Sequence, residues 1–418
     1  MSHEPSEESV DAPRHEWRIP PENPDPSQPS ATGKNRITWK DLLKHGSLFL
    51  ITFLTVTATG ILWVGQTANA ESFMDMVPEG ALFAIVFLLF LGTHEMGHYV
   101  AAVRHRVAVS LPWFIPVPFG IGTLGAVIKI KERVSDSIKL FDIGIAGPIA
   151  GFIVALVVLL YGLFTLPDPS FIASFDHHDE IVAHVEQYGS WPDNPPILTG
   201  VENGEEGGSM SMILGNTLLY SFLSSFFPDA PPMYELYHYP FLFAGWLGLF
   251  FTALNLMPVG QLDGGHILYS LLGYRKHKLV ARSTFAVIVS LAGLEAIPMI
   301  HESLQAWIPN LLPLSLAIWG IGLYLILRKS YQQDSQWIGR VWSVSLLATV
   351  LLLWFGWSPA ASGSMIWLFW SAFLAWFIGL EHPPAIQERP LTPVRRWLGW
   401  TSMVIFVLCI SPNPISFM

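Results

Sequence analysis

Two histidines and a glutamate stand at His94, Glu95 and His98, directly after an apolar run. Positions i and i+4 of a helix lie on one face, so both imidazoles would point the same way. Imidazoles one turn apart are common zinc ligands, and a glutamate between them is placed to act on a zinc-bound water. The alternative is a pair of helix histidines that bind no metal. Because ionisable groups at membrane depth are costly and usually functional, the pattern favours a zinc site with Glu95 as catalytic base.

A second polar segment runs from Asn255 to His266 and reads Asn-Leu-Met-Pro-Val-Gly-Gln-Leu-Asp-Gly-Gly-His. A zinc site with two histidines needs a third ligand, and a carboxylate is a usual one. Asp263 is the best candidate in the sequence. Pro258 should end the preceding helix, and the glycines around Asp263 let the backbone turn back towards a metal. The alternative is a polar loop at a helix end.

The composition indicates the class of protein that must position these residues. The 418-residue chain is 51% hydrophobic and 13% charged, with a mean hydropathy of +0.44. These values predict an all-α polytopic membrane protein. No basic and aromatic residues alternate as on a nucleic-acid-binding surface, so we expect no nucleic-acid partner. The single cysteine, Cys409, excludes an intrachain disulfide.

Apolar segments of about the length needed to cross a bilayer, ~20 residues, recur along the chain. They predict about nine transmembrane helices, near 46–66, 80–103, 142–166, 239–258, 280–299, 311–328, 341–357, 363–380 and 396–411. Residues 1–45 are expected to form a disordered cytoplasmic tail, which is too long to be the n-region of a signal peptide. Residues 46–275 would form a membrane core, and 276–418 would add accessory helices.

Basic residues predict the orientation, because they collect on the cytoplasmic side of membrane proteins. They cluster before the first span and after the second, fourth, sixth and eighth: Lys34, Arg36, Lys40 and Lys44; Arg104, Arg106, Lys129, Lys131, Arg133 and Lys139; Arg275, Lys276, Lys278 and Arg282; Arg328, Lys329 and Arg340; Arg389, Arg395 and Arg396. The loop 167–238 has many carboxylates and no Lys or Arg, so it is expected outside. Both polar segments then lie past the bilayer midplane, about 20 Å along their helices from the outer side.

These residues resemble the two signatures of the site-2 protease family (peptidase M50) of intramembrane zinc metalloproteases. The likeness lies in His94-Glu95-x-x-His98 and Asn255-x-x-Pro258-x-x-x-x-Asp263-Gly264. The segments 122–128 and 142–151 also resemble the family, most of all its bacterial and plastid branch with the EGY proteins. The resemblance covers about residues 80–275.

The resemblance implies a zinc metalloendopeptidase that holds one zinc ion per chain through His94, His98 and Asp263. Glu95 would act as base and acid, and Asn255 would donate a hydrogen bond to the developing oxyanion or hold the substrate. A helix-packing amide is the alternative for Asn255. The substrate would be a membrane-anchored protein cut in or near its transmembrane segment, in a bacterial plasma (inner) membrane. The natural substrate and the oligomeric state are not predicted.

A short membrane-associated β-hairpin is expected after the second helix, where the family carries one. The piece Leu124, Gly125, Ala126, Val127 and Ile128, continued to Ile130, is β-prone, and we hypothesise that its edge binds an extended substrate by strand addition. A plain surface hairpin is the alternative.

Other polar residues have open interpretations. Gly144, Gly147 and Gly151 are expected to allow close helix packing. The segment Asp176–Glu180 with His184 is interpreted as solvated and acidic, because histidine clusters without defined spacing are weak metal signals. His266 would either support the zinc site or begin a helix, and His105 is expected at the membrane interface.

The sequence disfavours two rival functions. A multi-span transporter should bury further charges along a path, and the spans after residue 280 show no ionisable residue at their apolar centres. An inactive membrane scaffold of the same fold is disfavoured because Glu95 and all three expected ligands are present.

Overall fold

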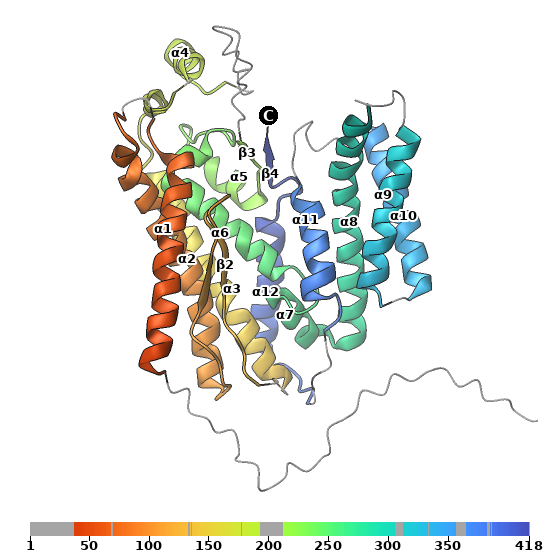
Figure 1. Ribbon diagram of the computed structural model, residues 1–418. Helices are drawn as coiled ribbons and strands as arrows, with labels where there is room; N and C mark the ends of the chain where they lie inside the picture. Colours follow the sequence, from red (N-terminus) through yellow and green to blue (C-terminus); the bar gives the residue numbers. More distant parts are fainter. Residues whose placement is uncertain are drawn as a thin grey trace, which may run out of the picture. The chain divides into compact units, whose positions relative to one another are not determined.

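A computed structural model describes residues 37–67, 70–132, 134, 136–176, 178–192, 212–305, 312–332, 334–356, 365–382, 385 and 387–417. The expected tail before residue 37 lies outside these residues. The described part is mostly helical (Figure 1). It therefore agrees with the predicted helical class.

Six helical segments are long and apolar enough to cross a membrane. They are α1 (Trp39–Val64), α2 (Val77–Arg104) with the short η1 (Phe73–Met76) before it, α3 (Ser137–Phe164), α8 (Tyr274–Gln305), α9 (Leu312–Ser330) and α10 (Ser335–Trp354).

The helices at the other three predicted spans are shorter. They are α6 (Pro240–Leu256), α11 (Ile366–Phe373) with its continuation η4 (Leu374–Ile378), and α12 (Pro393–Cys409). A helix of 17 residues is about 26 Å long, a little less than the ~30 Å hydrocarbon layer. The predicted count of nine spans is therefore not confirmed by length and composition among the described residues.

The first helix begins earlier than the sequence pattern suggested. Thr38 accepts a hydrogen bond from the backbone N–H of Asp41, whose carboxylate accepts one from the backbone N–H of Thr38. This reciprocal cap satisfies two backbone donors and fixes the start of α1 at Trp39. Residues 39–45 are thus helical, which corrects the predicted end of the disordered tail.

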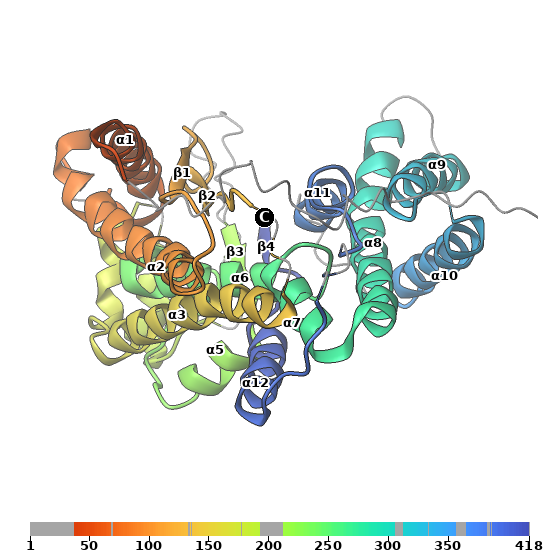
Figure 2. The ribbon, with the colours of Figure 1, turned by 90° about the horizontal axis from the view of Figure 1, so that it is seen from below.

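Helices α1, α2, α3 and α6 form the part of the fold that surrounds the predicted site (Figures 1 and 2). α2 packs on α1, α3 and α6, and α3 packs on α6. Glycines permit a close approach of α3 and α6, since a Cβ on Gly248 would lie 2.7 Å from the Cβ of Ala155. The interior is apolar and aromatic, with Phe83, Phe87 and Trp246 fully buried.

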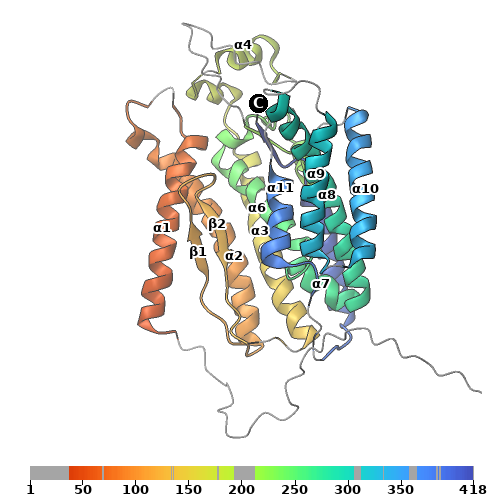
Figure 3. The same cartoon turned by 45° about the vertical axis from the view of Figure 1, so that its right-hand side comes forward.

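The predicted hairpin is present between α2 and α3. Strands β1 (Trp113–Pro116) and β2 (Thr123–Val127) are antiparallel, with Trp113 opposite Val127, and they lie beside α1 and α2 (Figure 3). The regular strand ends at Val127 rather than at Ile130. Beyond it the pairing continues irregularly, because the Ser110 N–H donates to the Lys129 carbonyl and Val109 bridges Ile130.

The loop between α3 and α6 contains short elements. They are η2 (Pro169–Ser174), α4 (Asp179–Tyr188), β3 (Met212–Leu214), α5 (Leu218–Ser224) and η3 (Leu236–His238). The last of these, η3, contacts α1. Strand β3 pairs with β4 (Ile415–Phe417) near the C-terminus, a long-range contact that no local pattern predicted.

Glu295 lies within the expected span 280–299 of α8, which corrects the expectation that the spans after residue 280 have no ionisable residue at their apolar centres. Arg282 of α8 is 2% exposed. Its guanidinium donates to Asp334 at 2.9 Å and to Glu381 at 2.7 Å. The carboxylate of Glu295 accepts from the backbone N–H groups of Trp367 and Leu368 at the start of α11. Both groups tie helices together, so they have structural partners.

Candidate metal centre

The imidazoles of His94 and His98 lie side by side on α2. Their Nε2 atoms are 3.1 Å apart, and the two residues are 3% and 6% exposed. The i, i+4 spacing brings them to one face of the helix, as the sequence predicted. This face is turned towards α3 and the start of α7 (Asp263–Leu272), which α3 contacts.

Asp263 reaches the same point from the second polar segment. Helix α6 ends at Leu256, two residues before Pro258, and Asp263 is the first residue of α7. Its Oδ2 lies 3.4 Å from Nε2 of His94 and 3.2 Å from Nε2 of His98. A Cβ on Gly264 would overlap the carbonyl of Leu256, so only glycine lets the chain fold back this tightly.

The three facing atoms form a donor set that suits a zinc ion. The Nδ1 of His98 donates to the carbonyl of Ile143 at 2.7 Å, because a carbonyl can only accept, and so its neutral Nε2 carries a lone pair. That lone pair faces a carboxylate oxygen and a second imidazole, which favours a shared cation. Tetrahedral zinc with bonds of about 2.0–2.1 Å separates its ligand atoms by roughly 3.3 Å. The separations of 3.1–3.4 Å fit that value.

Glycines of α3 make room for the two imidazoles. A Cβ on Gly147 would overlap the ring of His98, and a Cβ on Gly151 would lie 3.1 Å from Nδ1 of His94. A Cβ on Gly144 would lie 3.0 Å from the Cβ of His266. The expected packing role of these glycines is therefore specific, because two of them face the candidate ligands themselves.

Glu95 lies next to the hairpin as well as beside the histidines. It is 7% exposed, and the backbone of Ile128, directly after β2, lies close to its carboxylate. No sequence pattern indicated this contact or the one with the Ile143 carbonyl, since backbone groups can pair with any residue type. The hairpin thus continues to the candidate base.

Asn255 stands near the end of α6, one turn before the chain folds back. Its Nδ2 is 3.5 Å from Nε2 of His94. The amide therefore lies at the edge of the donor set rather than at a remote helix contact. His94, Glu95, His98, Asn255 and Asp263 are thus brought together, and their chemical roles stay predictions.

The model of the family described as peptidase family M50 matches residues 82–294, which include all five of these residues. The chain belongs to peptidase family M50. Curated relatives agree with this membership. The chain is 29% identical over 227 residues to the probable zinc metalloprotease EGY2, chloroplastic, of Arabidopsis thaliana, covering 54% of this chain and 34% of that protein.

Two further relatives bear similar names. One is the probable zinc metalloprotease EGY1, chloroplastic, of Oryza sativa subsp. japonica, 32% identical over 180 residues, 43% of this chain and 26% of that protein. The other is the probable zinc metallopeptidase EGY3, chloroplastic, of Arabidopsis thaliana. It is 29% identical over 251 residues, which cover 59% of this chain and 39% of that protein. The chain spans about a third of the length of these relatives. No solved structure matches it.

Two other histidines of the M50 region have partners away from the donor set. His266 Nδ1 lies 2.8 Å from Nε2 of His382. His105 Nε2 lies 2.8 Å from Oδ2 of Asp142, which also binds Arg395 through two hydrogen bonds of 2.7 and 2.8 Å. These contacts join α7 and α3 to the C-terminal part of the chain. His266 and His105 therefore hold helices together.

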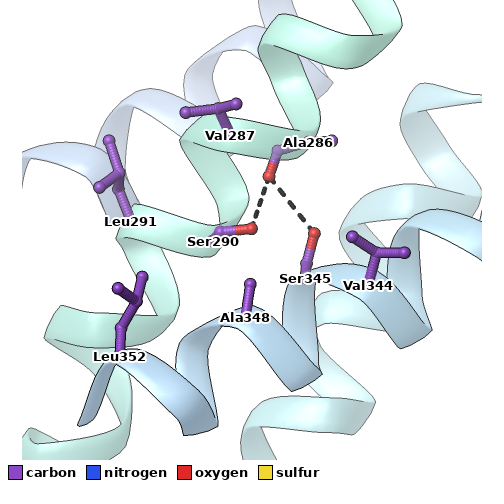
Figure 4. A pocket seen from close by; sticks show the side chains of 8 residues that line it. All are labelled: Ala286, Val287, Ser290, Leu291, Val344, Ser345, Ala348 and Leu352. Carbon is purple, nitrogen blue, oxygen red and sulfur yellow. Dashed lines mark hydrogen bonds between the residues drawn. The ribbon is translucent and has the colours of Figure 1, made fainter. Parts of the chain in front are cut away.

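A cavity between α8 and α10 lies outside the region that carries the candidate ligands. Figure 4 shows apolar side chains along it, with Val287 and Leu291 on one side and Val344 on the other. Its only hydroxyls among the labelled side chains, Ser290 and Ser345, donate to the carbonyl of Ala286. The cavity therefore offers no group for metal binding or proton transfer.

Proposed function

We propose that this M50 chain is an intramembrane zinc metalloprotease that hydrolyses a peptide bond in or near the transmembrane segment of a membrane-anchored protein. Such cleavage would be a step of regulated intramembrane proteolysis. The observation that carries the proposal is the meeting of His94, His98 and Asp263 within 3.1–3.4 Å among helices apolar enough to cross a bilayer. The expected partners are a transmembrane protein substrate and lipid.

The proposed ligands of the zinc ion are His94, His98 and Asp263. When bound, zinc supplies Lewis-acid chemistry, activating water and polarising the scissile carbonyl at neutral pH. The Ile143 carbonyl holds the tautomer of His98, and Gly147 leaves space for its ring. These protein groups keep the donors in place without a rearrangement at the moment of reaction.

The proposed base is Glu95. Its carboxylate accepts the proton of the attacking water as the carbon–oxygen bond forms, and it returns that proton to the amide nitrogen as the carbon–nitrogen bond breaks. The Ile128 backbone beside the carboxylate supports this role, because a backbone N–H there would hold the carboxylate in one position. Asn255, next to His94, is proposed to donate to the oxygen that becomes negative, a contact worth about 3 kcal/mol when well aimed.

The hairpin is proposed to bind the substrate. A transmembrane helix must unwind before its peptide bonds are reached, and unwound backbone in lipid needs hydrogen-bond partners. Strand β2 pairs with β1 on one edge, and within the described residues no other strand pairs with it. Leu124 and Val127 are 61% and 50% exposed. Residues 124–128 thus offer an edge whose continuation reaches Glu95.

The remaining parts of the proposal concern the whole chain. Residues 46–275 would be the catalytic core and 276–418 accessory helices. The N-terminus and the metal site would face the cytoplasm, because basic residues collect on the cytoplasmic side of membrane proteins and cluster at this end of the helices. The relatives named above are chloroplastic, so a bacterial plasma membrane stays a prediction.

The test is Glu95→Gln, which keeps the shape of the side chain and removes the base. We expect cleavage to fall by a factor of about 10² to 10⁴, with the zinc content of the purified protein unchanged. Comparative proteomics of membranes from cells with the active chain and with the variant would detect the uncut substrates, which should accumulate with the variant. An inactive scaffold or a transporter would give the same membrane proteome with both chains.

A further inference from the structure

A second cluster of possible metal ligands lies in the loop before α6. It consists of His178, just before α4, Glu235, just before η3, and His238, the last residue of η3. Oε2 of Glu235 lies 3.2 Å from Nε2 of His178 and 3.6 Å from Nε2 of His238. We call these three residues the loop triad.

Two backbone carbonyls orient the imidazoles of the loop triad. Nδ1 of His178 lies 2.7 Å from the carbonyl of Asp176, and Nδ1 of His238 lies 3.1 Å from the carbonyl of Trp63. Since a carbonyl can only accept, both Nδ1 atoms carry the proton. In the neutral rings both Nε2 lone pairs therefore face the carboxylate of Glu235. This is the arrangement in which metal-binding histidines are usually held.

Two members of the loop triad, Glu235 and His238, are buried, and their facing atoms lack hydrogen bonds. Glu235 and His238 are 3% and 7% exposed. Neither Oε2 of Glu235 nor Nε2 of His238 has a hydrogen-bond partner of acceptable geometry among the described residues. The ring of Phe175 covers His238, with centroids 4.0 Å apart. Buried polar atoms without partners are costly, so an unseen partner of positive charge would stabilise the cluster.

A single proton cannot pair all three facing atoms of the loop triad. Both Nδ1 atoms already donate to carbonyls, so a proton on one Nε2 pairs only that ring with Glu235. The other Nε2 then stays without a partner, whereas a metal ion accepts all three atoms at once.

We propose that His178, Glu235 and His238 bind a second zinc-type divalent ion. Two imidazoles and a carboxylate are a common donor set for zinc. Oε2 of Glu235 lies 3.2 Å from Nε2 of His178 and 3.6 Å from Nε2 of His238. The ligand atoms of tetrahedral zinc are roughly 3.3 Å apart, between these two distances. The ion would join the loop before α4 to the start of α6 and, through the Trp63 carbonyl, to the end of α1.

The sequence showed only part of this site. The sequence predicted a solvated segment over Asp176–Glu180 with His184, whereas His184 is half-buried and the side chain of His178 is turned inward, 12% exposed. The Glu235-x-x-His238 spacing was the missed signal, because residues i and i+3 share a helical face. The expected zinc count accordingly rises from one to two per chain.

The experiment isolates the loop triad by removing the first site. The full chain with His98→Ala, purified in detergent and stripped with a chelator, is titrated with Zn²⁺ in competition with a chromophoric indicator. We expect one equivalent to bind. Adding His178→Ala should abolish this binding, and adding His184→Ala, a change in the same segment outside the triad, should leave it intact.

A second change guards against misfolding of the histidine variant. Glu235→Gln keeps the shape of the side chain, and on the His98→Ala background it should weaken Zn²⁺ binding at least tenfold. Absence of binding to the His98→Ala chain, or binding that is unaffected by both triad changes, would overturn the proposal. Neither result depends on proteolytic activity, so the inference and the proposed function can fail separately.

Discussion

At the scale of single residues, the candidate site combines side chains that the sequence identifies with backbone groups that it does not. His94, His98 and Asp263 are recognisable by type and spacing. The Ile143 carbonyl, which binds His98, and the Ile128 backbone, which lies beside Glu95, are not. Any residue type can supply a backbone donor or acceptor, so only three-dimensional structure identifies these contacts.

The Ile128 contact leads to a prediction about the hairpin. Ile128→Pro removes the backbone N–H that meets Glu95, and Val127→Pro disturbs the exposed strand edge next to it. We expect each change to lower cleavage about tenfold or more, because a small misplacement of base or substrate is costly. Zinc content, measured by elemental analysis, should stay the same.

Ile128→Val is the matched control, since it keeps the N–H and a β-branched side chain. Normal cleavage by Val127→Pro would contradict substrate binding by strand addition. Normal cleavage by Ile128→Pro would show instead that Glu95 does not need this backbone contact.

At the scale of elements, the turn between α6 and α7 is held by the C-terminal helices. Gly260 in this turn has a φ of +55°, and its N–H donates to the carbonyl of Leu380, just after η4. The indole of Trp370 lies 3.4 Å from the sulfur of Met257. The helices after residue 275 therefore help to place Asp263, a closer link to the site than the sequence indicated.

Gly260→Ala should disturb this placement. A Cβ at residue 260 would overlap the carbonyl of Gly379, in addition to the strain of a positive φ. We expect the variant to lose most of its zinc at the first site and most of its cleavage, as measured by elemental analysis and by accumulation of uncut substrate.

Gly273→Ala is the control that separates the overlap with the Gly379 carbonyl from the strain of a positive φ. Gly273 has a φ of +76° but open space around a Cβ, so its substitution introduces backbone strain alone. A similar loss of zinc in both variants would argue against a specific contact between the turn and the C-terminal helices.

The predictability of the elements follows the range of the interactions that form them. Pro258 and its neighbouring glycines act locally, and the sequence foresaw that the helix would end there. The reciprocal cap of Thr38 and Asp41 is also local, but the first span was predicted from hydropathy alone, and the polar residues after the cap do not raise the hydropathy. By contrast, the pairing of β3 with β4 and the meeting of His178 with Glu235 and His238 depend on contacts between distant segments.

At the scale of the whole molecule, charge and contacts divide the helix ends into two groups. One group is joined by Asp142 with His105 and Arg395, and by Glu381 with Lys278 and Arg282. The other is joined by His238 with Trp63 and by β3 with β4. In the sequence, the 22 Lys and Arg residues all belong to the N-terminal tail or to segments that border the first group.

If the two groups lie on opposite sides of the membrane, as we propose, the shorter helices cross it as well. The start of α1 belongs to the first group, since Lys44 lies over the ring of Trp113 in β1, whereas β4 near the C-terminus belongs to the second. If the start of α1 and strand β4 lie on opposite sides of the membrane, the chain between them crosses it an odd number of times. The six long helices alone give an even number, so α6, α11 with η4, and α12 would supply the three more that the sequence predicted.

Cysteine labelling tests this orientation. The chain has one cysteine, which is buried, so Cys409→Ser gives a background without thiols. Glu186→Cys then marks the exposed face of α4, and Lys131→Cys marks the exposed segment after the hairpin. In sealed right-side-out vesicles, a membrane-impermeant maleimide should label Glu186→Cys at once and Lys131→Cys only after the vesicles are opened, because the basic side is proposed to face the cytoplasm. The unsubstituted Cys409→Ser chain controls for background. Labelling of both positions in sealed vesicles, or of Lys131→Cys alone, would contradict both the orientation and the cytoplasmic position of the metal site.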